Sequence, residues 1–282
     1  MRTGVTMMLS DRTIGVVELA RAAEDRGFES LYLPEHTHLP VECTSRALVG
    51  DGSVGDEYAR VPDPLVSLAA AAVGTSRIRL GTGVALVAQH DPIVLAKQVA
   101  TLDQLSGGRI VLGVGYGWNA EELADHGVAF DDRRAVVHEH LAVMQRLWDD
   151  DIASFDGAFV TLSPSRAWPK PVQRPRVRTL IGGGPSAALF RAVATHADGW
   201  MPLGGRGLSS SIPALQDAFR EAGRDPAHLD VVPFGTFPDR EKLEYFRTLG
   251  VTEVALGLPA SDEAETLRTL DAYAAIVEEL AL

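Results

Sequence analysis

The chain has 282 residues, of which 46% are hydrophobic, so it is long and apolar enough for one large α/β domain. Its formal net charge of −12 argues against a surface for nucleic acid or an anionic membrane, and no apolar run reaches the roughly 20 residues that span a bilayer. The single cysteine, Cys43, excludes an intramolecular disulfide, and the N-terminus lacks a secretory signal, so we expect a cytoplasmic protein.

Strand and helix patterns alternate along the chain. Short apolar runs predict strands at 4–9, 30–34, 78–84, 110–114, 178–182, 199–202, 230–235 and 253–257. Apolar residues spaced three or four apart predict helices at 13–26, 64–73, 92–105, 133–149, 186–195, 208–222, 240–249 and 263–280. This order predicts a (β/α)8 TIM barrel in a single domain over residues 1–282, with a doubly wound open sheet as the alternative.

Two stretches are longer than ordinary loops. Residues 36–63 follow the second predicted strand. Residues 150–177 precede the fifth, and within them 152–162 predict a hairpin that turns at Asp156-Gly157. We therefore expect a barrel with a short insertion before its fifth strand, and both stretches to lie near the carboxyl ends of the strands, where barrel active sites are built.

Glycines mark the ends of three predicted strands. The fourth strand ends in Gly113, Gly115 and Gly117, which would let a flat ligand lie against bare backbone. The third ends in Leu-Gly-Thr-Gly-Val at 80–84, which indicates either a bulge or a close-packed barrel end. The fifth ends in three glycines at 182–184 and opens a helix, which is typical of either an anion site or a capped glycine turn.

Two histidines follow the second strand. His36 and His38 are either loop histidines or a proton donor and ligand contacts at the barrel mouth. A metal site would need further histidines at later strand ends, which the sequence lacks, so we predict none. The two histidines at 138 and 140 lie about 200° apart around their helix, and we expect a solvated face there.

Several of these pieces together resemble one family. The segment 96–115, AKQVATLDQLSGGRIVLGVG, looks like the signature of the bacterial luciferase-like monooxygenase superfamily. Residues 33–36 (LPEH), 80–84 (LGTGV) and 197–200 (ADGW) resemble its other landmarks in the same order. The three glycines at 182–184, combined with 197–200, resemble its branch of F420-dependent oxidoreductases.

The resemblance implies a (β/α)8 barrel that binds a deazaflavin or flavin at its carboxyl mouth. The ring would lie against a bulge at Thr82, Gly83 and Val84 that contains a non-prolyl cis peptide, with His36 beside it. Gly115, Tyr116 and Gly117 would line the ring or tail. The phosphate end of the tail would be held by Gly182, Gly183, Gly184 and Ser186.

This resemblance implies an F420-dependent oxidoreductase that transfers a hydride between deazaflavin C5 and a small organic substrate, with His36 exchanging a proton. The alternatives are an FMNH2-dependent monooxygenase that uses O2 and a flavin-binding barrel without catalysis. The family also implies a homodimer. We expect His38, Trp118 and Trp200 in the substrate pocket. Sugar-oxidising relatives carry a glutamate where this chain has Trp118, so we do not expect sugar-phosphate oxidation.

Overall fold

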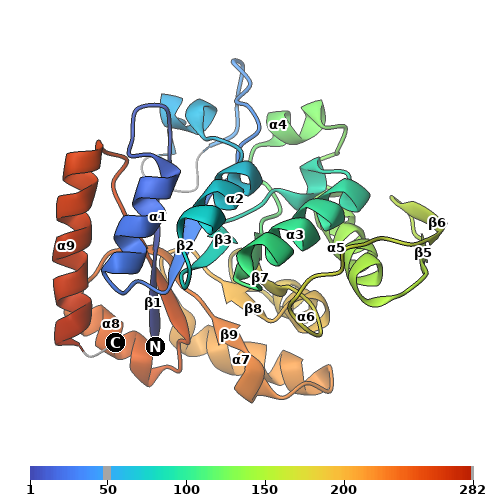
Figure 1. The fold of residues 1–282 in the computed structure, drawn as a ribbon. Coiled ribbons are helices and arrows are strands. Elements are labelled where there is room, and N and C mark those ends of the chain that lie inside the picture. The colour runs from blue at the N-terminus through green and yellow to red at the C-terminus, as the bar shows by residue number, and fades with distance from the viewer. Residues whose placement is uncertain (47–51, 281–282) are drawn as a thin grey trace.

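The computed structural model describes residues 1–46 and 52–280, and in this part of the chain the main sheet has nine strands, all parallel (Figure 1). Their order in the sheet is β10-β11-β1-β2-β3-β4-β7-β8-β9. Their bounds are β1 (Arg2–Thr6), β2 (Ser30–Leu33), β3 (Arg79–Thr82), β4 (Ile110–Val114), β7 (Arg178–Gly182), β8 (Gly199–Met201), β9 (Asp230–Val231), β10 (Phe234–Thr236) and β11 (Glu253–Gly257).

The sheet closes into a barrel because β9 and β10 are two halves of one strand. On one side, Val232 N–H donates to the Trp200 carbonyl at 2.9 Å. On the other, Ala255 N–H donates to the carbonyl of Pro233 at 2.9 Å. Pro233 has no N–H of its own, so the ladder is interrupted between the two halves. The (β/α)8 barrel predicted from the sequence is therefore confirmed for the described residues.

Helices surround this barrel (Figure 1). Asp63 and Asp91 cap α2 and α3 by accepting backbone N–H groups, as expected for an N-cap aspartate before a proline. Among the described residues, none of the helices combines the length and the apolar character needed to cross a bilayer. The helices are α1 (Val16–Asp25), α2 (Pro64–Gly74), α3 (Pro92–Ser106), α4 (Ala120–Asp125), α5 (Arg133–Asp149), α6 (Ala187–His196), α7 (Leu208–Glu221), α8 (Arg240–Thr248) and α9 (Glu263–Glu279), with 3-10 turns η1 (Asp56–Arg60), η2 (Val87–Gln89) and η3 (Pro226–His228).

The predicted insertion hairpin is present as β5 (Ala153–Asp156) and β6 (Thr161–Ser165), an antiparallel pair outside the barrel sheet (Figure 1). It corrects the prediction of a solvated face on α5. Glu139 accepts three N–H groups of the hairpin turn, at residues 158–160. His140 is buried against the Val87 carbonyl, and His138 is half-buried. Helical periodicity could not reveal this, because the covering element is remote in sequence.

The amino-terminal end of the barrel is closed by charged and polar side chains from the first residues of strands. Glu253 lies at their centre and is fully buried. Its carboxylate accepts hydrogen bonds from Ser30 and Tyr32, both at 2.6 Å, and pairs with Arg178 at 3.1 Å. Burial raises the pKa of Glu253, but Arg178 and the two hydroxyls outweigh it and hold the pKa below its usual value. The remaining members of this ring are Arg2, Arg79 and Asp230.

Gly113 in β4 and Gly115 just after it leave room for the close approach of β3 and its exit. A Cβ on Gly113 would lie 2.1 Å from the Thr82 carbonyl oxygen, and one on Gly115 would lie 2.4 Å from Val84. Their bare backbone therefore accommodates β3 and its exit, a packing role that the sequence analysis did not assign to them. We expect Gly113→Ala to lower the free energy of unfolding by at least about 2 kcal/mol.

Chemical denaturation checks this prediction, with Gly184→Ala as the matched control. A Cβ on Gly184 would meet no described atom within 4 Å, so its stability should change little. Equal stability of the two variants would contradict the close approach of β3 to Gly113.

Candidate active site at the carboxyl end of the barrel

His36 follows β2 and is held by a buried carboxylate. Its Nδ1 lies 2.9 Å from Oε2 of Glu122 on α4, and the other carboxylate oxygen accepts the Thr37 N–H at 3.0 Å. Burial raises the pKa of Glu122, but His36 and the Thr37 N–H outweigh it, so the pKa falls below its usual value. An ionised carboxylate accepts only, so Nδ1 carries a proton and Nε2 is the atom that can exchange one.

This pairing is absent from the sequence prediction, and the one local signal near it marks only the start of α4. Asn119 caps α4 by accepting the Glu122 N–H at 3.0 Å, which places Glu122 at the third helical position. In a capping box a glutamate at that position turns back toward the cap. Here Glu122 turns to the loop after β2 instead, so an Asn-x-x-Glu pattern identifies the helix start but not the carboxylate's partner.

Two aromatic rings pack on the His36 imidazole. Trp118 lies edge-to-face at 5.4 Å between ring centroids, and Tyr58 from η1 does so at 5.3 Å. Tyr58 and Trp118 also contact each other, at 5.7 Å. The long loop after β2 thus returns over its own starting point, and Trp118 lies beside His36.

The exit of β3 has the bulge that the resemblance implied. The Gly83–Val84 peptide is cis, as predicted. Gly83 N–H donates to the Leu33 carbonyl at 2.7 Å, and the buried Thr82 hydroxyl donates to the Gly113 carbonyl at 2.7 Å. Val84 is half-buried. Of the three predicted ring contacts, Thr82 and Gly83 are buried and Val84 is partly exposed.

Glu35 fixes this exit from the other side. Its buried carboxylate accepts the Leu86 N–H at 2.6 Å and lies 2.9 Å from Nε2 of His90. Burial lowers the pKa of His90, but the hydrogen bond and charge of Glu35 outweigh it and raise the pKa above its usual value. Adjacent residues, Glu35 and His36, therefore hold the exits of β3 and β4.

The glycine turn after β7 lies beside a small cavity. Gly183, with φ of +138°, and Gly184 are exposed, and Ser186 caps α6 by accepting the Leu189 N–H at 3.2 Å. A helix N-terminus with exposed N–H groups favours an anion. The cavity is lined by Tyr116, Arg134, His138, Gly183, Gly184, Ala188 and Leu189.

Arg134 lines this cavity but was not predicted from the sequence. It lies in the first turn of α5, where a charged residue is ordinarily solvated, and its guanidinium is 5.4 Å from the Tyr116 ring centroid. With the α6 N-terminus it gives the cavity a positive charge suited to a phosphate. The predicted residues Tyr116, Gly183 and Gly184 are brought together here.

Two residues predicted for the substrate pocket have other contacts within the protein. Trp200 is 0% exposed, and its indole N–H donates to the Gly183 carbonyl at 2.9 Å, so it supports the glycine turn from beneath and does not wall a pocket. His38 is partly exposed, and its two ring nitrogens lie 2.9 Å from Asp125 and from the Thr37 hydroxyl. Trp200 entered the prediction because a strand-end position does not tell which way a side chain points.

A latch joins the loop after β2 to α4. The Glu121 carboxylate accepts the Thr44 N–H at 2.8 Å and the hydroxyls of Thr44 and Ser45 at 2.5 and 2.7 Å. These hydrogen bonds lower the pKa of Glu121 to about 2, so the carboxylate stays ionised near neutral pH. Neighbouring carboxylates on α4 thus hold the loop at 36–37 and again at 44–45.

We expect Glu121→Gln to release the loop at residues 44–45. An amide oxygen cannot replace a carboxylate that accepts from several donors, so the Thr44 amide should exchange its hydrogen several-fold faster. Hydrogen-exchange mass spectrometry of the peptide around 44 measures this. The exposed Glu42→Gln is the matched control, and equal exchange in both variants would exclude the latch.

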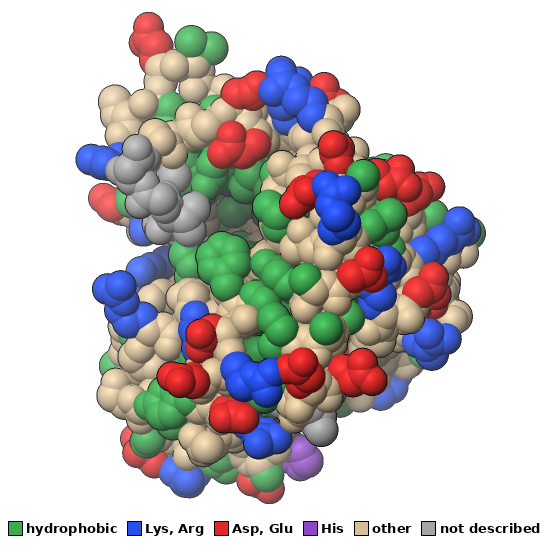
Figure 2. All heavy atoms as spheres, turned by 90° about the vertical axis from the view of Figure 1, so that its left-hand side faces the viewer, with side chains coloured by type: hydrophobic (Ala, Val, Ile, Leu, Met, Phe, Trp, Pro, Cys, Tyr) green, Lys and Arg blue, Asp and Glu red, His purple; other side chains and the backbone are tan. Residues whose placement is uncertain are grey.

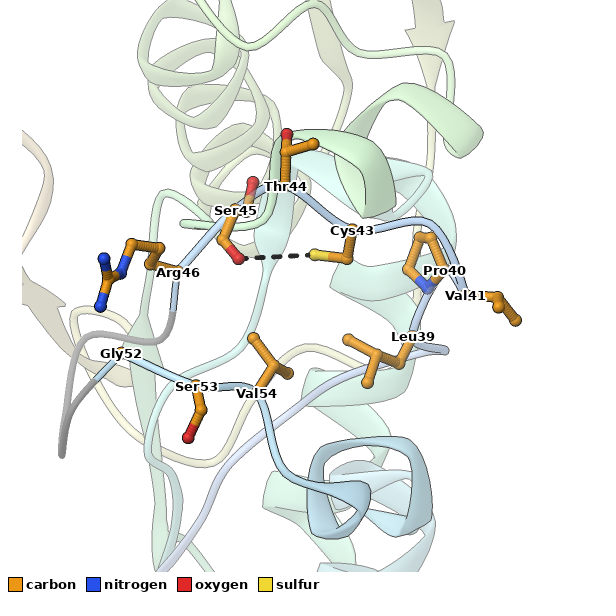
Figure 3. A pocket seen from close by; sticks show the side chains of 10 residues that line it. All are labelled: Leu39, Pro40, Val41, Cys43, Thr44, Ser45, Arg46, Gly52, Ser53 and Val54. Atoms are coloured by element: carbon orange, nitrogen blue, oxygen red, sulfur yellow. Dashed lines mark hydrogen bonds between the residues drawn. The ribbon is translucent and has the colours of Figure 1, made fainter.

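The same loop encloses a second hollow (Figure 3). Within it, the Cys43 thiol donates to the Ser45 carbonyl at 3.7 Å. Of the described residues that line it, none is among those predicted to bind a coenzyme. They are Leu39, Pro40, Val41, Cys43, Thr44, Ser45, Arg46, Gly52, Ser53 and Val54.

Hydrophobic side chains also gather on the side that lies at the left of Figure 1. Figure 2 shows them in the middle of that face, beside a hollow, with acidic and basic side chains around them. An apolar opening with a charged rim is typical of a site for an organic ligand.

Comparison with known proteins assigns the family. The model of the luciferase-like monooxygenase family matches residues 6–244. An uncharacterized protein of Mycobacterium tuberculosis is 45% identical over all of this chain and 98% of its own. The crystal structure of the monooxygenase RslO1 from Streptomyces bottropensis superposes with a TM-score of 0.81 at 22% identity, covering 100% of both chains. An F420-dependent secondary alcohol dehydrogenase in complex with an F420–acetone adduct does so at 0.78 and 18%, covering 99% of both. The chain therefore belongs to the luciferase-like monooxygenase family.

Proposed function

We propose that this protein is an F420-dependent oxidoreductase acting on a small organic substrate. The observation that carries this proposal is the ionised Glu122 bound to His36 beside the bulge at Gly83–Val84. The deazaflavin would supply a hydride donor or acceptor at its C5. The chain would supply a proton at His36 Nε2 and a site from which water is excluded by Tyr58 and Trp118.

The residues at the mouth fit such a coenzyme. Thr82, Gly83 and Val84 would lie under the ring, and Gly115, Tyr116 and Gly117 would line the ring or the start of the tail. The open space at Gly184 and the guanidinium of Arg134 suit a phosphate next to the α6 N-terminus. We assign the phosphate to Gly182, Gly183, Gly184, Ser186 and Arg134.

Glu122 gives His36 a defined part in the reaction. With Nδ1–H held by the carboxylate, Nε2 can accept a proton from an alcohol as it is oxidised, or return one to a carbonyl oxygen as it is reduced. The negative charge of Glu122 stabilises the imidazolium that forms in the first direction. Removing Glu122 would thus act through His36.

An FMN-dependent monooxygenase is the second candidate, because RslO1 is a monooxygenase and the small cavity suits the phosphate of either coenzyme. Titration of the purified protein with F420 and with FMN, followed by tryptophan fluorescence, separates the two. We expect quenching by F420, largely lost in Trp118→Phe while calorimetry still records binding. Tight FMN binding without F420 binding would overturn the first choice, and binding of neither would leave a barrel without flavin chemistry.

We also propose a homodimer through α2 and α3, which pack side by side. Val66 and Val73 on α2 are 71% and 83% exposed, and Val94 and Leu105 on α3 are 54% and 61% exposed. Light scattering after size exclusion should give twice the chain mass. Val73→Glu should give a monomer, whereas Ile152→Glu, at an exposed apolar residue of the insertion, should not. A wild-type monomer would contradict this arrangement.

A further inference from the structure

A tyrosine and a histidine form a hydrogen-bonded pair in the wall of the small cavity. Tyr116, at the exit of β4, places its hydroxyl 2.9 Å from Nε2 of His138 on α5. Both residues line the cavity together with Arg134 and the glycine turn at 183–184. The pair therefore faces the space that we assign to the coenzyme phosphate.

The surroundings of both side chains favour their neutral forms. Burial lowers the pKa of His138, and the charge of Arg134 lowers it further. Burial also raises the pKa of Tyr116 to about 12, against a smaller opposite effect of Arg134. The other side of His138 is covered by His196, whose ring stacks on it at 5.3 Å; burial, with smaller contributions from His138 and Arg176, lowers the pKa of His196 to about 4.

The direction of the hydrogen bond depends on whether Nε2 of His138 carries a proton, and in the gate described below the neutral ring has its proton on Nδ1 and accepts at Nε2. A neutral His138 that accepts at Nε2 uses the one hydroxyl proton of Tyr116, so the tyrosine presents only lone pairs to the cavity. Those lone pairs repel an anion. A protonated His138 donates from Nε2 to the tyrosine oxygen, and the hydroxyl proton is released to point into the cavity.

We propose that Tyr116 and His138 are a proton-gated donor in the phosphate site: a bound phosphate draws one proton onto His138, and the Tyr116 hydroxyl then donates to the phosphate. This inference rests on the proposed function, because it places the coenzyme phosphate in this cavity. The proton comes from solvent and stays on the imidazole, and no covalent bond changes.

The charge of the bound phosphate should determine how much of His138 becomes protonated. Arg134 and a protonated His138 together supply two positive charges, which match the dianion of a phosphomonoester such as FMN. The phosphate of F420 is a diester with a single negative charge, for which Arg134 alone suffices. We therefore expect proton uptake to be larger with FMN than with F420.

An NMR titration with inorganic phosphate tests the gate without any coenzyme. The His138 imidazole signal is assigned from its loss in His138→Gln. Its measured pKa should rise by about 1 to 3 when phosphate replaces chloride at equal ionic strength, as for an opposite charge at close range. An unchanged pKa at phosphate concentrations that saturate binding, or no phosphate binding, would overturn the gate.

Calorimetry with FMN in two buffers of different ionisation enthalpy then counts protons. Between the free and the phosphate-bound pKa of His138 we expect uptake approaching one proton, with affinity falling about tenfold per pH unit across that window. His138→Gln should abolish the uptake, and His228→Gln, at an exposed histidine of η3, should retain it. Tyr116→Phe should weaken FMN binding by about 10- to 100-fold, the loss of a hydrogen bond to a charged group.

These results separate the gate from the proposed function. FMN binding without uptake, or undiminished uptake in His138→Gln, would overturn the gate and leave the coenzyme site intact. Phosphate-induced protonation of His138 without binding of F420 or FMN would support the gate and contradict the proposed function.

Discussion

Replacing His36 by alanine is expected to lower turnover by about 10²- to 10⁴-fold while coenzyme binding stays nearly unchanged. The imidazole would supply the proton at Nε2, and no other described ring is bound by Glu122 in the same way. Coenzyme affinity should persist because the contacts proposed for the tail, at Gly182–Gly184 and Arg134, would not be changed. Steady-state kinetics of the wild type and the variant, with affinity from fluorescence titration, measure both quantities.

Two further variants sharpen this prediction. Glu122→Gln should keep the fold of α4, because Asn119 caps its backbone N–H, but shift the pH profile of turnover as the imidazole loses its negative partner. His228→Ala, an exposed histidine far along the chain, is the matched control and should leave turnover unchanged. Unaltered turnover in His36→Ala would remove His36 from the mechanism.

Glu253→Leu is expected to reduce the free energy of unfolding by about 3–5 kcal/mol, the cost of breaking a buried ion pair from one side. The leucine would leave Arg178 without this partner and would free the hydroxyls of Ser30 and Tyr32 inside the barrel. Because these groups close the amino-terminal end of the strands, the loss should be global. Urea denaturation followed by circular dichroism gives the value.

The matched control is an exposed ion pair. Glu265→Leu removes the partner of Arg268 on α9, where both side chains are more than half exposed, so the change should stay below about 1 kcal/mol. A similar loss in both variants would mean that the polar ring at the barrel floor contributes no more than a surface pair.

Local patterns predicted the elements of this fold well, because each depends on residues near in sequence. The strands at 110–114, 178–182 and 253–257 and the helix at 133–149 have the predicted bounds. The short helix α4 was missed, since six residues give too little periodicity. Its two glutamates are therefore the part of the site that sequence patterns placed least well.

What the sequence could not supply were partners across the fold. Glu122 and His36 are 86 residues apart, and only the barrel's closure brings the exits of β2 and β4 together. The gated pair shows the same limit, because Tyr116 was predicted to line the coenzyme site while His138 was assigned to a solvated helix face. The sequence shows which residue types could take part in chemistry. The partners that set their pKa values and orientation lie on other strands or helices.

A crystal structure of the protein with F420 tests the central claim most directly. We predict the deazaflavin ring against Thr82, Gly83 and Val84, with C5 facing the space beside His36, and the phosphate within hydrogen-bond distance of Gly183, Gly184 and Arg134. Density for the coenzyme in another place, such as the hollow enclosed by residues 39–46 and 52–54, or no density at saturating F420, would contradict it.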